Sequence, residues 1–435
     1  MPQIAIIADD LTGATDTGVQ FAKAGLRTHV MLGVDDNQVL PETADVVVVN
    51  TDSRSLAAAA AYEQAARAAK LIQTSPVSII YKKIDSTLRG NLGAEIDAVL
   101  DQFAFDCAVI APAFPQIGRI TVGGYHLLHH QPLQSTEIAL DGQLPLADSR
   151  LPAVLRAQSR YGVEHVELAT VLAGEAAMRE RLQACLAENA RLISFDATDE
   201  THLQAIVQAM HHTEAHILWV GSAGLAECLT ALCQPAERHF CSRPASGDLP
   251  VLVIAGSVSS VTAGQIQAFT AQPGRALVSV SSEQLLAEPE RELERCVVSA
   301  RACLRQRKHV AIVSSRGRQS VEQARLYGGR LGLDAAAVSG FIAGKLGVIA
   351  RKLVDEGVEG VFVTGGDTAV SVCHALGAAS MEICSEVAPG IPLCRLGSGK
   401  YAGLKVVTKA GAFGDIQAVN QAVAAIQNSE ELNRV

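Results

Sequence analysis

The sequence predicts an α/β fold of two domains, each built on a largely parallel sheet with helices on its faces. Short apolar runs alternate with amphipathic runs along nearly the whole chain, as strands and helices do in layered α/β proteins. The composition agrees, because 49% of the residues are hydrophobic and only 4% are aromatic. The chain has 435 residues, which is more than one hydrophobic core usually organises, so two domains are expected.

A polar run without periodicity separates the two halves of the chain. It extends from Gln234 to Leu249 and contains two prolines, a composition typical of linkers between domains. We therefore expect a first domain over residues 1–234, a linker over residues 235–249 and a second domain over residues 250–435.

Charge and cysteine usage narrow the class of protein. The formal net charge of −9 argues against nucleic acid or an anionic membrane surface as a partner. No apolar run approaches the ~20 residues of a membrane-spanning helix, and Met1–Ile4 lacks the basic leader of a signal peptide. The 10 cysteines include no Cys-x-x-Cys pair, which is typical of buried or incidental thiols in a cytoplasmic protein.

Polar side chains follow three predicted strands of the first domain, at residues 3–8, 44–51 and 77–81. In chain order, these polar groups are Asp9 and Asp10, then Asp52 and Arg54, then Lys82, Lys83 and Asp85. The carboxyl ends of parallel strands lie on one edge of a sheet, where ligands bind in open α/β folds. We therefore expect these side chains to share one binding site, although Asp and Thr after a strand are also common helix N-caps.

The loop Tyr81–Gly93 carries the richest set of chemical groups. Its three cations, one carboxylate and two hydroxyls are Lys82, Lys83, Arg89, Asp85, Ser86 and Thr87. Cations bind the carboxylate of a small polyhydroxy acid, and an Asp with hydroxyls binds its hydroxyl groups. The alternative is a solvated strand end with a polar helix cap. If the strand extends to residue 83, Lys83 and not Lys82 shares a face with Asp85.

Arg119 and a group of histidines give weaker signals in the first domain. Arg119 lies in an irregular loop and would add a cation to the same edge. His126, His129 and His130 suggest a metal site, but no carboxylate or cysteine stands at a ligand-like spacing. We therefore interpret them as core or surface histidines and assign no metal ligand among them.

Glycine-rich turns at strand ends are the main signal of the second domain. They follow the apolar runs 250–255, 360–363 and 406–408, and the sharpest is Thr364–Thr368. Its two glycines let backbone amides approach a phosphate, the helix N-terminus favours the charge, and Asp367 is placed to hold Mg²⁺. The alternative is that glycine merely permits tight turns. The motifs of P-loop proteins and of dinucleotide dehydrogenases are missing.

Five motifs of the chain occur in a specific order and spacing. They are Ile7–Ala14, Lys82–Asn91, Ala111–Pro115 with Gly118-Arg119, Gly365–Thr368 and Lys409–Asp415. Together they resemble the four-carbon acid sugar kinase family, from Ile4 to about Asp415. The resemblance implies an N-terminal domain that binds a sugar acid, a C-terminal domain that binds a nucleotide, and an active site in the cleft between them. Members transfer a phosphoryl group from ATP to the terminal hydroxyl of tetronates or oxo-tetronates.

The resemblance also implies which residues bind the two substrates. The sugar-acid contacts would be Asp9, Arg54, Lys82, Lys83, Ile84 and Asp85, and the charge of the nearby Arg89 adds it to this set. Between the two lysines the resemblance favours Lys82, which agrees with a strand that ends at Tyr81. The nucleotide contacts would be Ser257, Gly365, Gly366, Asp367, Thr368 and Gly411. ATP and Mg²⁺ are the expected cofactors. The candidates for a base near the attacking hydroxyl are Asp9, Asp10, Asp85 and Asp415.

The expected reaction is phosphorylation of D-threonate to D-threonate 4-phosphate. The sequence of the Lys82–Gly90 loop is more similar to D-threonate and D-erythronate kinases than to 3-oxo-tetronate kinases, which leaves D-erythronate or a 3-oxo-tetronate as alternative acceptors. Two other classes are an NAD(P)-dependent oxidoreductase, disfavoured by the missing dinucleotide motif, and a non-catalytic acid sensor, disfavoured by the many carboxylates. The partner is expected to be a small molecule. The sequence sets neither the stereochemistry of the acid nor the oligomeric state, and an oligomer is possible.

Overall fold

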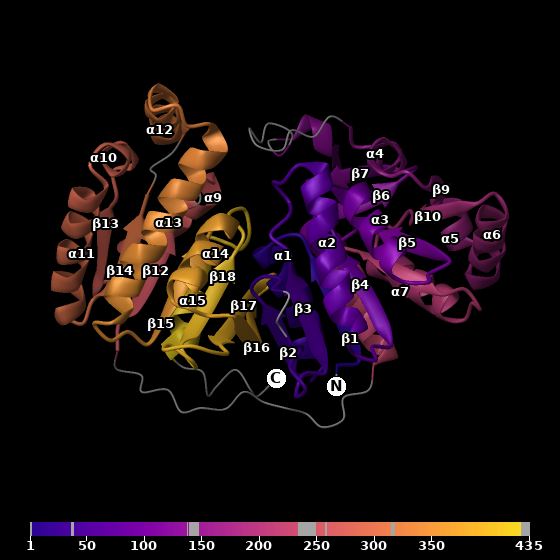
Figure 1. Ribbon diagram of the computed structural model, residues 1–435, viewed down its shortest axis with the longest axis horizontal. Coiled ribbons are helices and arrows are strands. Elements are labelled where there is room, and N and C mark those ends of the chain that lie inside the picture. The colour runs from indigo at the N-terminus through magenta and orange to yellow at the C-terminus, as the bar shows by residue number, and fades with distance from the viewer. Residues whose placement is uncertain are drawn as a thin grey trace. The chain divides into compact units, whose positions relative to one another are not determined.

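The computed structural model describes residues 2–35, 39–136, 138, 148–233, 249–256, 259–314 and 318–427 (Figure 1). The chain forms two compact units, Met1–Arg238 and His239–Val435. The predicted linker, residues 235–249, lies outside the described residues except for Leu249. The exact domain bounds, and an active site between the two domains, stay predictions.

The first unit is built on a parallel sheet with the strand order β2-β3-β1-β4-β11-β5-β10-β9. Its strands are β1 (Ile4–Ala8), β2 (Thr28–Met31), β3 (Val46–Asn50), β4 (Ile79–Lys83), β5 (Cys107–Ala111), β9 (Gly162–Val166), β10 (Ala190–Phe195) and β11 (Ile217–Gly221). β1 and β3 are buried at every position, as expected of parallel strands covered on both faces.

Helices and a small second sheet complete the first unit. The helices are α1 (Leu11–Lys23), α2 (Ala58–Gln73), α3 (Leu92–Gln102), α4 (Leu151–Gln158), α5 (Leu168–Leu172), α6 (Glu175–Ala187), α7 (Glu200–His211) and α8 (Ala223–Leu229). The antiparallel sheet contains β6 (Arg119–Val122), β7 (Tyr125–Leu128) and β8 (Gln131–Pro132). The irregular loop that the sequence predicts over Pro112–Thr121 ends earlier than expected, because Arg119–Thr121 belong to β6. Gly123 and Gly124, both at positive φ, form the tight turn between β6 and β7.

The second unit has a sheet of strand order β13-β14-β12-β15-β18-β17-β16. Its strands are β12 (Val251–Ala255), β13 (Arg275–Ser279), β14 (His309–Val313), β15 (Gly360–Thr364), β16 (Ser380–Ala388), β17 (Ile391–Leu396) and β18 (Lys405–Lys409). The helices are α9 (Ser260–Thr270), α10 (Ser282–Ala287), α11 (Pro289–Arg305), α12 (Arg318–Arg330), α13 (Ala335–Val354), α14 (Gly366–Ala375) and α15 (Ala418–Gln427). β13, β14, β12, β15 and β18 pair in parallel, whereas β17 runs antiparallel to β16 and β18. The predicted α/β fold with largely parallel sheets is confirmed.

In each unit, the connections that follow two neighbouring strands diverge, one running toward each side of the sheet. In the first unit β1 leads toward β2, whereas its neighbour β4 leads toward β5 on the other side. In the second unit β12 leads toward β13, whereas its neighbour β15 leads toward β16. Ligands of open α/β sheets bind outside the carboxyl ends of strands at such a switch point. The fold thus places one candidate site in each unit, at β1/β4 and at β12/β15.

Helix α13 is held against α14 through glycine. The two helices pack side by side (Figure 1), and a methyl group on Gly347 would lie 2.5 Å from the carbonyl oxygen of Ser371. Gly344, one turn earlier, has open space around it. Among the described residues no single helix is long and apolar enough to cross a membrane, and α13 meets that criterion only jointly with residues 320–330 across a bend of 109°.

The two glycines of α13 provide a matched test of this packing. Gly347→Ala is expected to lower the free energy of unfolding by about 1–3 kcal/mol, since the added methyl group meets backbone that cannot move alone. Gly344→Ala is expected to be neutral or stabilising by up to about 1 kcal/mol, because alanine favours the helix. Urea unfolding of both variants measures the difference. Equal stabilities would contradict the close approach of α13 and α14.

Candidate functional site

Arg54 joins two carboxylates at the end of β1. Its Nε and Nη2 atoms lie 2.7 and 2.9 Å from the two oxygens of Asp9, and its Nη1 and Nη2 atoms each lie 2.7 Å from an oxygen of Asp10. Asp10 also caps α1, accepting a hydrogen bond of 2.7 Å from the Gly13 amide. Burial raises the pKa of Asp9, but the charge and hydrogen bonds of Arg54 and the charges of Lys82 and Lys83 together outweigh it, and the pKa is lowered overall. Both carboxylates and their shared cation therefore form one fixed group.

The two lysines at the end of β4 have different environments. β4 extends to Lys83, so Lys82 and Lys83 point to opposite faces of the sheet. The Lys82 ammonium is completely buried, 2.7 Å from a carboxylate oxygen of Glu95 on α3 and 2.6 Å from the Lys83 carbonyl oxygen. The Lys83 ammonium lies 3.7 Å from Asp16 of α1 and borders Gly13, where an added Cβ would be only 2.8 Å away. Lys83 is therefore on the side of α1 that faces Arg54 and Asp10.

Asp85 is held in its charged form by its own loop. Thr87 Oγ1 donates a hydrogen bond of 2.5 Å to the carboxylate, and Arg89 Nε lies 2.7 Å from the same oxygen. Burial raises the pKa of Asp85, but Arg89 and Arg54 outweigh it and hold the pKa well below its usual range. The neighbouring Ile84 is buried, and its amide donates to the Gly221 carbonyl oxygen at 2.9 Å. Ile84 thus fixes the loop to β11 by its backbone.

Glu95 and Asp16 of this site escaped the sequence analysis, whereas His126 is the buried histidine that it allowed for. Glu95 binds Lys82 and accepts a hydrogen bond of 2.8 Å from Ser53. Burial raises the pKa of Asp16 to about 6. His126, whose pKa burial lowers to about 4, donates from Nε2 to the Ser86 carbonyl oxygen at 2.9 Å. Glu95 lies in the mostly apolar run Leu92–Leu100, and that signal could have indicated a buried partner. Asp16 lies among threonines and glycines, so the sequence gives no such signal for it.

In the second unit, two glycines bring strand ends together at β12 and β15. Gly365 has a φ of 105°, which side chains other than glycine rarely adopt, and its amide donates to the Lys409 carbonyl oxygen at 3.1 Å. Helix α14 starts at the next residue, with Asp367 exposed in its first turn. Gly256, after β12, packs so closely on Thr368 that a Cβ would lie 2.0 Å from its hydroxyl. The predicted contact Ser257 lies outside the described residues.

Lys409 organises the loop that carries Gly411. Its buried ammonium donates to the carbonyl oxygens of Ala410, Gly411 and Phe413 at 2.9, 3.0 and 3.2 Å. Burial lowers the pKa of Lys409 to about 7. Gln265 Nε2 adds bonds of 3.0, 3.1 and 2.8 Å to the carbonyls of residues 413, 414 and 415. The turns after β12, β15 and β18, which are adjacent strands, therefore lie together at one edge.

The predicted site residues thus fall into two groups, one in each unit. Asp9, Asp10, Arg54, Lys82, Lys83, Ile84, Asp85 and Arg89 belong to the edge of the first sheet, and Gly365, Gly366, Asp367, Thr368 and Gly411 to the edge of the second. Within the described ranges, no group of three or more His, Cys, Asp or Glu side chains could hold a metal ion. Mg²⁺ needs only one or two carboxylates when phosphates supply its other ligands, and the exposed Asp367 fits that requirement.

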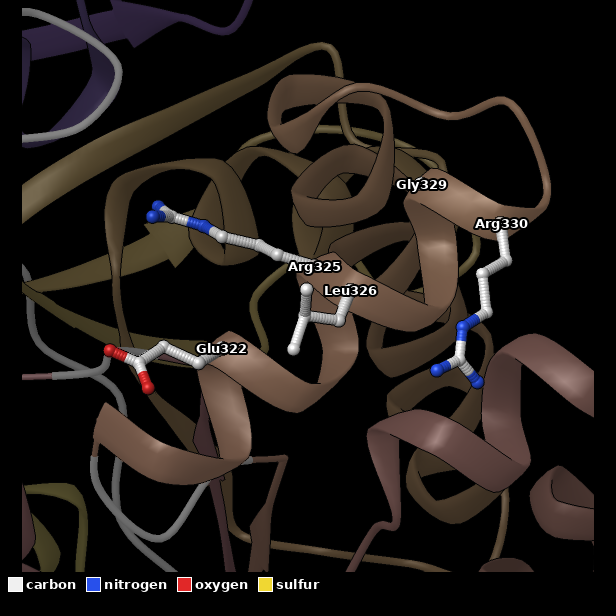
Figure 2. A pocket seen from close by; sticks show the side chains of 5 residues that line it. All are labelled: Glu322, Arg325, Leu326, Gly329 and Arg330. Atoms are coloured by element: carbon white, nitrogen blue, oxygen red, sulfur yellow. The ribbon is translucent and has the colours of Figure 1, made fainter.

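A cavity of about 680 Å³ lies on α12, lined by residues 322, 325, 326, 329 and 330. Figure 2 shows all of these side chains on the same helix, with Arg325 and Arg330 extending in different directions. Leu326 is 68% exposed there. The cavity shares no residue with either candidate site, and a single helix provides its lining, so it is an open surface feature.

Two family models match the chain, one in each unit. A sugar-binding N-terminal domain matches residues 4–229, and a nucleotide-binding C-terminal domain matches residues 252–419. A solved structure of Haemophilus influenzae protein HI1011 has a TM-score of 0.73 and 25% sequence identity, covering 97% of this chain and 100% of the other.

Named relatives cover almost all of the chain. A D-threonate kinase of Salmonella typhimurium LT2 is 37% identical over 95% of both chains. A D-erythronate kinase of Heliobacterium modesticaldum is 35% identical over 96% of this chain and 95% of the other. A 3-oxo-tetronate kinase of Brucella melitensis is 28% identical over 95% of this chain and 93% of the other. With both domain models and these relatives in agreement, the chain belongs to the four-carbon acid sugar kinase family.

Proposed function

We propose that this protein uses ATP and Mg²⁺ to phosphorylate the C4 hydroxyl of a four-carbon sugar acid, with D-threonate as its substrate. The observation that carries the proposal is the group of charges at the β1/β4 switch point, where Arg54, Lys83 and two carboxylates surround the start of α1. Such a group can bind both ends of a small hydroxy acid: cations bind the carboxylate, and carboxylates accept hydrogen bonds from the hydroxyls.

The two lysines have different roles in this proposal. Lys82 is fully committed to Glu95 and two backbone carbonyls, so we assign it to holding β4 and α3 together. Lys83 lies beyond hydrogen-bond distance from Asp16, which leaves its ammonium able to bind the carboxylate of the acid. Arg54, also beside Gly13, would supply a second cation through the one of its five N–H groups that does not donate to Asp9 or Asp10.

The carboxylates would orient the sugar hydroxyls. Asp9 and Asp85 have lowered pKa values, which makes them weak bases but good hydrogen-bond acceptors for hydroxyl groups. Arg89 would act through Asp85, whose charged form it stabilises. Phosphoryl transfer depends mostly on positioning and charge neutralisation, so strong basicity is not required of these residues.

The nucleotide would bind at the edge of the second sheet. The Gly365–Thr368 turn would present backbone amides to phosphate oxygens at the start of α14, where the helix dipole favours negative charge. Asp367 would hold Mg²⁺, which neutralises charge on the transferring phosphoryl group. Gly411, together with Ser257, would complete the nucleotide contacts, on a loop that Lys409 and Gln265 keep in place.

The similarity to the relatives supports the choice of acceptor. Identity is 37% to the D-threonate kinase, 35% to the D-erythronate kinase and 28% to the 3-oxo-tetronate kinase. A coupled assay of ADP release over the four-carbon acids tests the choice directly, and D-threonate is expected to give the largest kcat/KM. Reduction of NAD⁺ or NADP⁺ by these acids would instead support an oxidoreductase, and binding without ADP release would support a sensor.

The roles of the lysines predict opposite results for two substitutions. Lys83→Met should lower kcat/KM for D-threonate roughly ten- to a hundredfold, since one charge-assisted contact contributes about 1.5–3 kcal/mol. It should cost less stability than Lys82→Met, because the Asp16 carboxyl left behind already has a pKa of about 6 and can become protonated. Lys82→Met should lower the free energy of unfolding by about 3–5 kcal/mol, because Glu95 is left buried without its partner.

Steady-state kinetics and urea unfolding of both variants distinguish the roles. Adding Glu95→Gln to Lys82→Met should restore much of the lost stability, because the unpaired charge is removed. A stable Lys82→Met variant with weak acid binding, beside a fully active Lys83→Met variant, would show that Lys82 binds the carboxylate instead.

The nucleotide turn is tested by two glycines at opposite ends of α14. Gly365→Ala places a Cβ at a φ of 105° and should distort the turn, weakening ATP binding at least about tenfold, the equivalent of 1.4 kcal/mol. D-threonate binding should not change. Gly377→Ala also introduces alanine at a positive φ, of 68°, in open space, so it controls for strain. Calorimetric titration of each variant with ATP and with D-threonate measures both affinities. An equal loss of ATP affinity in both variants would refute the assignment of the Gly365–Thr368 turn to the nucleotide.

Acid binding should depend on the protonation of Asp16. D-threonate is ionised above pH 5, since carboxylic acids have pKa values near 4. As the pH falls through about 6, Asp16 becomes neutral and stops competing for Lys83. The affinity for D-threonate should therefore rise from pH 7.5 to pH 5.5, by up to about tenfold for one pKa unit of coupling. Asp16→Asn should show the higher affinity at both pH values, and an unchanged pH dependence in this variant would contradict the role of Asp16.

A further inference from the structure

A second concentration of positive charge lies in the first unit, away from the β1/β4 switch point. It surrounds a cavity of about 240 Å³ beside the edge strand β9. The residues that line it are Gly123, Gly124, Arg150, Pro152, Arg156, Glu164, His165, Glu167 and Arg181. None of them belongs to the site assigned to the sugar acid.

The floor of this cavity is rigid because Asp196 holds it together. The Asp196 carboxylate is completely buried and accepts hydrogen bonds from the amides of Gly123, Gly124 and Leu168 at 2.7, 3.0 and 3.0 Å. The same carboxylate accepts a hydrogen bond of 3.1 Å from His165 Nε2, which fixes the orientation of the imidazole ring in the lining of the cavity. Four donors satisfy one carboxylate, so the Gly123-Gly124 turn, the start of α5 and the His165 ring are held together at the floor of the cavity.

The lining of this cavity holds three arginines, at positions 150, 156 and 181, and two glutamates, at positions 164 and 167, so its formal charge is positive by one. Arg181 is paired with Glu164 at 2.8 Å. Arg156 donates to the Val163 carbonyl oxygen at 2.9 Å, and Arg150 lies over the Tyr125 ring at 5.9 Å. Among the described residues neither Arg150 nor Arg156 makes an ion pair with a carboxylate. Two guanidinium groups with full charge therefore face a small cavity.

We propose that this cavity binds the phosphate group of a small anion, with Arg150 and Arg156 as its main ligands and Arg181 as a third. Guanidinium groups offer paired N–H donors that match phosphate oxygens, and several of them together suit a dianion better than a single carboxylate. The volume is below the roughly 300 Å³ at which pockets for drug-sized ligands begin. A phosphate with a short carbon chain suits this size, whereas a nucleotide is too large.

Calorimetric titration of the whole protein with inorganic phosphate, without nucleotide or sugar acid, tests the proposal. Arg150→Gln/Arg156→Gln should weaken phosphate binding at this site at least about tenfold, as expected when charge-assisted contacts are lost. Arg179→Gln is the matched control, because Arg179 is on the same helix as Arg181 but pairs with Glu175 at 3.1 Å outside the cavity. The control should bind phosphate like the wild type. Comparison among variants cancels binding at the other two sites.

A variant with the opposite expected effect makes the result independent of folding defects. Glu164→Gln removes a negative charge from the lining and releases Arg181, so it should tighten phosphate binding about three- to tenfold. Malonate should bind more weakly than phosphate, and glycerol 3-phosphate should bind more tightly than phosphate if an ester is the natural ligand. Unchanged phosphate binding in a folded double variant, a failure of Glu164→Gln to tighten it, or a preference for malonate would each overturn the proposal.

Discussion

The interaction of Arg54 with Asp9 and Asp10 is the constraint on which the first site depends. Two carboxylates at consecutive positions repel each other, and partial burial makes their charged forms more costly. One guanidinium that bonds to all four oxygens removes both problems. It also ties the end of β1 to the segment after β3, so the polar ends of these two strands form one rigid group.

The same site depends on glycine for close approach. Gly13 and Gly90 border this ionic group, and a Cβ on Gly13 would lie 2.5 Å from an Asp10 oxygen. Gly90 has a φ of 97° and lies beside the Arg54 side chain. The loop and the helix can therefore enclose the charges with little space between them, which strengthens each ionic contact by excluding water. In the second unit Gly256 and Gly365 have the corresponding role around backbone amides.

Buried lysines stabilise both edges, but in different ways. Lys82 binds a carboxylate, and the pair keeps its charges in balance. Among the described residues, Lys409 binds carbonyl and hydroxyl oxygens and no carboxylate, and burial lowers its pKa to about 7. The first arrangement fixes a strand to a helix. The second holds an irregular loop in one conformation by donating hydrogen bonds to its backbone carbonyl oxygens, which are not paired with a neighbouring strand in the described part of the sheet.

The sequence by itself determined the α/β class, the two polar edges and the family motifs, because these depend on local periodicity and on residues close together in the chain. The sequence also indicated that a strand reaching residue 83 would put Lys82 and Lys83 on opposite faces of the sheet, and β4 does extend to Lys83. Only the tertiary structure showed that Glu95 pairs with Lys82, that Asp16 approaches Lys83, and that β6 and β7 form a hairpin. Those contacts depend on which helix packs on which face of the sheet and on the order of the strands, and neither is encoded in the local pattern of any one segment.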